Sequence, residues 1–95
     1  MIKVVIERHC LPDKEVDLMK LLVELRSIAM WENGYHSGET LRSIEDPSLW
    51  LVIGTWQDIE HWQAWYDSPK RKEISTQINR LSSEPEKVSV FSFIR

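Results

Sequence analysis

The side chains best suited to acid–base chemistry in this chain are histidines and one arginine. His36 opens a predicted strand and His61 precedes Trp62, and either imidazole titrates near neutral pH, so it could act as a general base. Arg42 shares a strand face with His36 by alternation and could neutralise a phenolate or a carboxylate. We therefore take His36 and Arg42 as candidate catalytic residues.

Each of these residues also has a structural interpretation. His61 follows Glu60 on a helix whose tryptophans face inward, so its ring is expected to face solvent. His36 would be an interface residue if its strand face met a partner. For Arg42 the alternative is an ordinary surface arginine. His9 stands at a strand end, where a surface position is expected.

A cluster of aromatic residues could form the wall of a ligand pocket. Three of the five tryptophans lie between Trp56 and Pro69, and the three-residue spacing of Trp62 and Trp65 places both indoles on one face of a helix. Core packing explains such a cluster as well as ligand binding does, because indoles bury a large area in either case. We predict that Trp56, Trp62, Trp65 and Tyr66 line a substrate pocket.

Several other kinds of chemistry are disfavoured. Cys10 is the single cysteine and has no base beside it in sequence, so neither a disulfide nor nucleophilic catalysis is expected. The histidines at positions 9, 36 and 61 lack metal-ligand spacing, and we expect neither a metal nor a cofactor. Glu7 and Glu39 could supply a carboxylate across neighbouring strands, but a solvated strand edge explains both equally well.

The charge and hydropathy of the chain limit its partners and its compartment. A net charge of −3 with both signs scattered provides no basic surface for a nucleic acid. No apolar run is long enough to span a bilayer, and the N-terminus does not follow the order of a signal peptide. We expect a cytoplasmic protein that binds neither nucleic acid nor membrane.

The elements that must position these residues follow a regular order. Apolar periodicity and turn signals predict strands at 2–8, 35–44, 49–56 and 88–94. A first helix of about five turns is predicted to be capped by Asp13 and to end near Asn33-Gly34. A second helix is predicted to be capped by Asp58, to bend at Ser68-Pro69 and to continue to Leu81. The order βαββαβ is typical of a ferredoxin-like α+β domain, an antiparallel sheet with helices on one face. We expect one such domain over residues 1–95.

The strands are apolar on both faces, although helices would cover only one. Leu49 to Ile53 is a continuous apolar run, and the first and last strands also place apolar residues on both sides. The simplest cover is the same sheet of a second copy, so we expect a homodimer through sheet-to-sheet packing. Val52 and Val90 would face the partner in one of the two registers. The alternative is a monomer whose twist and strand ends hide these residues.

The chain resembles the antibiotic biosynthesis monooxygenase (ABM) domains of the dimeric α/β-barrel superfamily. The similarity spans nearly the whole chain, and its pieces are Glu24-Leu25-Arg26, Gly34 to Leu41, Glu45-Asp46-Pro47, Trp56 to Glu60, Trp62 to Trp65 and Ser68-Pro69. The resemblance implies a dimeric α/β barrel with a pocket between the sheet and the helices of each subunit.

The same resemblance implies two kinds of activity. Some members of the family oxidise electron-rich phenols, quinols or anthrones without a cofactor, and others degrade haem. The haem-degrading branch uses an asparagine on the first strand, a tryptophan matched here by Trp65, and a histidine ten residues later. This chain has Ser75 at that histidine position and Glu7 near the asparagine position, so haem degradation by that route is disfavoured. We expect cofactor-independent oxidation of a small aromatic substrate, with a non-catalytic dimeric ligand-binding domain as the alternative.

Overall fold

Four antiparallel strands and three helices make up the computed structural model, which describes residues 1–94. In chain order the elements are β1 (Ile2–His9), α1 (Glu15–Ala29), β2 (Tyr35–Arg42), β3 (Leu49–Trp56), α2 (Ile59–Tyr66), α3 (Pro69–Asn79) and β4 (Lys87–Ser92). The strands lie in the order β2-β3-β1-β4 and every neighbouring pair is antiparallel. This is the ferredoxin-like α+β fold that the sequence predicts.

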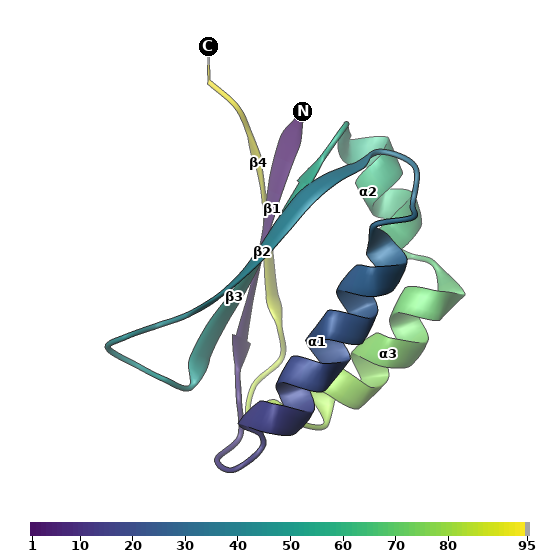
Figure 1. The fold of residues 1–95 in the computed structure, drawn as a ribbon. Coiled ribbons are helices and arrows are strands. Elements are labelled where there is room, and N and C mark those ends of the chain that lie inside the picture. Colours follow the sequence, from purple (N-terminus) through teal and green to yellow (C-terminus); the bar gives the residue numbers. More distant parts are fainter. Residues whose placement is uncertain (95) are drawn as a thin grey trace.

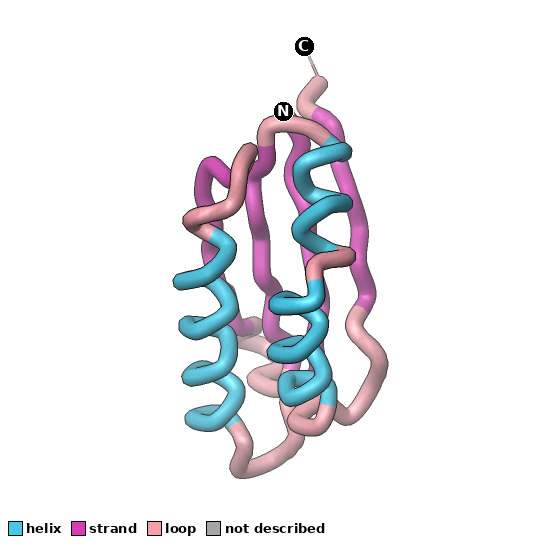
Figure 2. Tube along the Cα trace, turned by 90° about the vertical axis from the view of Figure 1, so that its right-hand side faces the viewer, coloured by secondary structure: helices cyan, strands magenta, loops and turns pink. Residues whose placement is uncertain are grey.

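All three helices lie on the same face of the sheet, as Figure 1 shows. Figure 2 looks onto that face, with α1 in one column and with α2 and α3 following each other in a second column. The opposite face of the sheet is uncovered in the described part of the chain. The hydrophobic core therefore lies in the single layer between the sheet and the helices.

Period-two alternation decides which strand residues enter this core. Val4 and Ile6 of β1 are buried, and their cross-strand partners Gly54 and Val52 therefore also face the helices. The same alternation carries Arg8 inward at the end of β1, where it is buried as completely as an apolar core residue. An arginine thus occupies a core position of β1, one of the two inner strands.

Helix α1 is shorter than the sequence predicts and does not use the predicted cap. Asp13 adopts a left-handed conformation with φ of 64°, so it belongs to the turn before the helix, and Lys14 occupies the N-cap position without a side-chain cap bond. The helix has 15 residues and ends at Ala29. The chain then turns through residues 30–34 and enters β2 after Gly34, whose φ of 87° favours glycine.

The predicted start of α2 and the bend that follows it are confirmed. The Asp58 side chain accepts a hydrogen bond from the backbone N–H of His61, and this bond caps α2. Ser68 caps α3 in the same manner and Pro69 occupies its first turn, so the predicted bend is a break between two helices. Within residues 1–94, no helix combines the length and the apolarity needed to cross a bilayer.

The strand register shows which residues occupy the uncovered face. Val52 pairs with Ile6, and Val90 pairs with Val4, so both valines lie on the side of the helices. The prediction that Val52 and Val90 face a partner sheet is therefore wrong, because it used the other of the two strand registers. The uncovered face carries the apolar side chains that alternate with them in the strands, namely Val5, Leu41, Leu51, Ile53 and Phe91.

Candidate functional site

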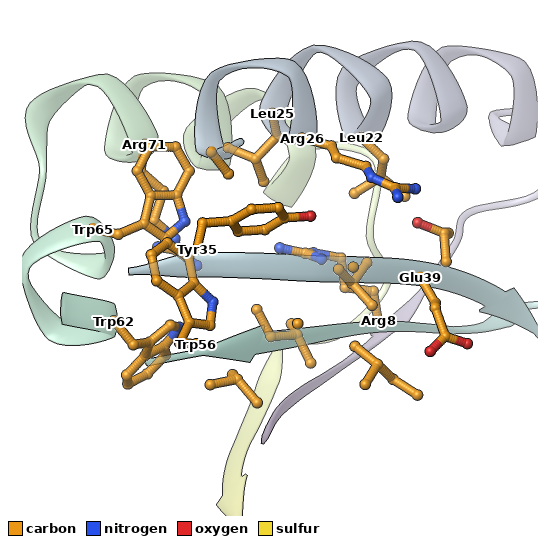
Figure 3. A pocket seen from close by; sticks show the side chains of 18 residues that line it. Arg8, Leu22, Leu25, Arg26, Tyr35, Glu39, Trp56, Trp62, Trp65 and Arg71 are labelled. Atoms are coloured by element: carbon orange, nitrogen blue, oxygen red, sulfur yellow. The ribbon is translucent and has the colours of Figure 1, made fainter. Parts of the chain in front are cut away.

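A cavity lies between the inner face of the sheet and the helices. Its volume of ≈ 70 Å³ is several times the roughly 10–15 Å³ that one water molecule needs. Residues of all three helices and of strands β1, β2 and β3 line it. Figure 3 shows aromatic rings gathered at one end and the Arg8 side chain reaching in from the sheet. The cavity is therefore an apolar space with charged groups at its border.

The aromatic end is built from three elements that meet at the corner after β3. The Tyr35 ring packs edge-on against Trp56, with centroids 5.3 Å apart and an angle of 85° between the planes. Trp56 in turn stacks on Trp65 of α2 at 6.4 Å and 24°. Both distances fall in the range of favourable aromatic pairs, so each ring fixes its neighbour. Trp56, Trp62 and Trp65 line the cavity as expected from the sequence, and Tyr35 is an additional member of the wall that the sequence did not predict.

Tyr66 supports this wall from behind and does not line the cavity. Its ring lies 5.0 Å from that of Trp62, and the guanidinium of Arg71 lies 4.0 Å above the Tyr66 ring. A guanidinium over an aromatic face is attracted by the quadrupole of the ring. Tyr66 thus holds Trp62 and Arg71 in place, and Arg71 itself lines the cavity.

Two arginines and one glutamate form a buried ion cluster beside the cavity. Arg8 Nη2 donates to Glu86 Oε2 at 2.9 Å, and Arg71 Nη2 donates to Glu86 Oε1 at 3.3 Å. The two arginine side chains are 1% and 5% exposed and the glutamate is 14% exposed, so water screens these charges poorly. One carboxylate is therefore shared by two guanidinium groups.

Arg8 keeps hydrogen-bonding capacity that the described residues do not use. Its Nε and Nη1 are buried and have no hydrogen-bond partner among residues 1–94. Burial lowers the pKa of Arg8 from its usual value, Glu86 opposes that change, and Arg71 adds to it. Arginine nevertheless stays protonated, because its intrinsic pKa is very high. A buried cation with free N–H donors thus lines the cavity.

Gly38 makes room for the tyrosine of the wall. A Cβ atom at this position would lie 2.6 Å from the Tyr35 hydroxyl oxygen and 3.5 Å from the carbonyl oxygen of Ile53. The strand therefore needs glycine here for the Tyr35 side chain to lie across it. In Figure 3 the Tyr35 ring and the Arg8 guanidinium extend into the same space between the sheet and α1.

His36 does not enter the cavity, contrary to the alternation expected for its strand. The pairing shifts between Tyr35, which faces Trp56, and Ser37, which faces Thr55, so a bulge interrupts the alternation at His36. The imidazole Nε2 lies 3.0 Å from Gln57 Oε1 and the side chain is exposed. The shared face with Arg42 is therefore absent.

Arg42 lies on the helix side of the sheet but beyond the end of the cavity. It pairs with Trp50 across the strands and its guanidinium lies 5.4 Å from the Trp50 ring. Its Nε donates to the Pro47 carbonyl at 2.6 Å, and Nη2 lies 3.8 Å from Glu15 Oε1. These contacts tie the β2–β3 connection to the start of α1.

The remaining candidate residues have surface or packing contacts. His61 Nδ1 lies 2.6 Å from Asp58 Oδ1, and His9 Nε2 lies 3.5 Å from a carboxylate oxygen of Glu84. Burial raises the pKa of the Cys10 thiol, which suits a core residue and not a nucleophile.

Of the two glutamates considered as carboxylate donors, Glu7 lies away from the cavity, whereas the exposed Glu39 lies at its border. Glu7 pairs with Lys87 on the uncovered side of the sheet, with 3.8 Å between the charged atoms. Glu39 pairs with Ile53 across β2 and β3, and both residues line the edge of the cavity although neither is buried.

Sequence reasoning missed the buried ion cluster. A signal for Arg8 is present, because it continues the alternation of Val4 and Ile6 and so belongs to the same strand face. No comparable signal exists for its partner, because Arg8 and Glu86 are 78 residues apart. Their meeting depends on the pairing of β1 with β4, which places Glu86 just before the edge strand.

The fold and the cavity define a ferredoxin-like α+β domain with a partly open apolar space between sheet and helices. Residues 1–89 match the family described as antibiotic biosynthesis monooxygenase, and the chain belongs to this family. No curated protein sequence matches it significantly.

Solved structures of low sequence identity share the fold. A conserved protein from Methanosarcina mazei Go1 has a TM-score of 0.89 at 20% identity, covering 95% of this chain and 89% of that chain. Rv0793 from Mycobacterium tuberculosis has a TM-score of 0.88 at 18% identity, covering 99% and 95%. A mutant of SnoaB, a cofactor-independent oxygenase from Streptomyces nogalater, has a TM-score of 0.89 at 13% identity, covering 99% and 93%.

Proposed function

We propose that this domain is a monooxygenase that oxidises a small, electron-rich aromatic compound, a phenol or quinol, in the cavity between sheet and helices and without a cofactor. The observation that carries the proposal is the aromatic wall of Tyr35, Trp56 and Trp65 beside an apolar cavity. Membership of the monooxygenase family supports it, as does the fold shared with the cofactor-independent oxygenase SnoaB.

The chemistry requires an ionised substrate in a dry site. An aromatic anion transfers an electron to O₂ far more readily than its neutral form, and the resulting ring radical and superoxide combine to a peroxide. The peroxide takes up the proton that the substrate lost, and elimination of water leaves one oxygen atom on the ring as a carbonyl. The protein excludes water and positions the ring, and the wall of indoles is suited to both tasks.

Oxygen uptake tests this proposal. Wild-type protein is incubated with a panel of quinols and phenols, and we expect oxygen consumption above the protein-free rate with at least one compound. Ala29→Leu adds three carbon atoms at a buried position that lines the cavity, and it should reduce that rate by about tenfold or more by displacing the ring. Ala64→Leu makes the same change at an exposed position of α2 and should leave the rate unchanged. Equal rates in all three proteins contradict the proposal.

A non-catalytic ligand-binding domain is the second candidate. It is favoured by one observation: among the described residues, those that line the cavity include no histidine that could act as a base. In that case an aromatic ligand quenches the tryptophan fluorescence and is recovered unchanged. A haem titration without a Soret shift removes haem handling as a third candidate.

We also propose that the uncovered face of the sheet packs against a second copy of the chain. Leu41 and Phe91 are 46% and 54% exposed, and they lie on that face together with Val5, Leu51 and Ile53. Exposed apolar residues gathered on one face in this way are characteristic of an interface. Leu51→Asp should give a monomer in size-exclusion chromatography with light scattering. A dimer that survives this substitution excludes the proposed interface.

A further inference from the structure

The ion cluster beside the cavity contains more positive than negative charge. Arg8 and Arg71 share the single carboxylate of Glu86, which accepts one hydrogen bond from each of them. Burying an uncompensated charge is costly, because the protein interior solvates it less well than water does. The cluster therefore favours an additional anion at the cavity.

Besides excess positive charge, an anion site needs N–H groups that are free to donate hydrogen bonds, and Arg8 provides them. Its Nε and Nη1 are buried without a partner in the described part of the chain, and the side chain lines the cavity. Water molecules in the cavity could accept these hydrogen bonds, but they carry no charge that would balance the second guanidinium. An oxyanion satisfies both the free donors and the charge.

The surroundings of Arg8 define the rest of the ligand. The aromatic wall lines the same cavity, whose surface is mainly apolar apart from the two buried arginines and the exposed Arg26 and Glu39 at its border. Glu86 is the carboxylate that acts on Arg8. We propose that the ligand is an aromatic anion whose carboxylate or ionised hydroxyl oxygen accepts hydrogen bonds from Arg8 while its ring lies against Trp56 and Trp65. This inference rests on the proposed function only in assuming that an aromatic molecule occupies the cavity.

Isothermal titration calorimetry with a matched pair of ligands tests the preference for an anion. The probes are 2-naphthoate and 2-naphthamide, which have the same ring and similar shape but differ in charge. Hydrogen bonds to charged groups are stronger than neutral ones, so wild-type protein should bind the carboxylate about tenfold or more tightly than the amide. Equal affinities, or no binding of either probe, overturn the proposal.

Four substitutions locate the residue responsible for the preference. Arg8→Met should bring the affinity ratio of the two probes close to one, and Arg8→Lys should retain part of the preference because it keeps the charge with fewer donors. Arg80→Met removes an exposed arginine outside the cavity and should leave the ratio as in wild type. If the ratio collapses in Arg26→Met and persists in Arg8→Met, the exposed Arg26 at the border of the cavity is the anion site and the proposal is wrong.

A chromogenic phenol distinguishes the two kinds of oxyanion. Stabilisation of a phenolate by Arg8 should increase the visible absorbance of 4-nitrophenol at a pH where the free compound is half ionised, and Arg8→Met should abolish the increase. If only naphthoate shows the preference, the ligand is a carboxylate; an increase with nitrophenol extends it to phenolates. These readouts are independent of turnover: a preference for the anion without oxygen uptake contradicts the proposed function alone, and oxygen uptake without the preference contradicts this inference alone.

Discussion

Replacing Glu86 by glutamine should destabilise the fold strongly, because two buried arginines depend on this one carboxylate. The substitution keeps the shape of the side chain and removes its charge. Arg8 and Arg71, whose Nη2 atoms lie 2.9 and 3.3 Å from the carboxylate oxygens, would then be two buried cations without a counter-ion. Removing one partner of a buried ion pair is costly for this reason.

The size of the effect follows from the burial of the cluster. Breaking a buried pair costs about 3–5 kcal/mol, and the 14% exposure of Glu86 places the expected loss near the lower end, at about 3 kcal/mol. Since a domain is stable by only about 5–15 kcal/mol, this is a large part of the free energy of unfolding. The urea midpoint should fall by about 1–3 M for the slopes usual in small proteins.

Urea unfolding followed by tryptophan fluorescence measures this loss directly, because Trp50, Trp56, Trp62 and Trp65 are buried. Glu84→Gln is the matched control, since Glu84 is 62% exposed and its contact with His9 is 3.5 Å long. An exposed pair of this kind contributes about 0–1 kcal/mol. If Glu86→Gln and Glu84→Gln unfold at the same urea concentration, the buried arginines do not depend on the carboxylate and the charge balance derived for the cluster is wrong.

Three further predictions concern the framework around the site. Gly34→Ala should destabilise the domain by about 1 kcal/mol or more, because φ is 87° and a Cβ would lie 2.5 Å from the His61 side chain; a thermal midpoint equal to that of wild type would contradict this. Cys10 should react with iodoacetamide about tenfold or more slowly in the folded protein than in urea, because burial raises its pKa; equal rates would show that the thiol is accessible. The backbone N–H of His61, and then the His61 ring, lower the pKa of Asp58. The Asp58 carboxylate therefore contributes its full stabilisation above the pKa of the unfolded state, about 3.9, and this stabilisation is lost as the pH falls through the lower pKa of the folded state. Asp58→Asn should therefore lose less stability than wild type between pH 5 and about pH 2, and an equal loss would exclude the carboxylate as a source of acid sensitivity.

Local signals in the sequence account for the elements and for much of the aromatic wall. The Asp58 side chain caps α2 by accepting a hydrogen bond from a backbone N–H three residues later, and Ser68-Pro69 separates α2 from α3. Both signals are local, so these helix ends can be predicted without knowledge of the tertiary structure. The three-residue spacing of Trp62 and Trp65 likewise places them on one helical face.

Features that depend on the register between strands could not be predicted. The bulge that removes His36 from the inner face is defined by how β2 pairs with β3, and nothing in residues 35–37 alone specifies it. Both faces of β3 are apolar, so the sequence could not decide between Val52 and Leu51 as the residue on the uncovered side. The meeting of Arg8 with Glu86 is equally non-local.

A crystal structure of the protein with 2-naphthoate would test the central claim most directly. We predict that the naphthalene ring lies in the cavity against Trp56 and Trp65, with a carboxylate oxygen within hydrogen-bonding distance of Arg8. A ligand bound on the uncovered face of the sheet, or one whose carboxylate contacts solvent-exposed arginines while Arg8 remains unpartnered, would contradict the claim.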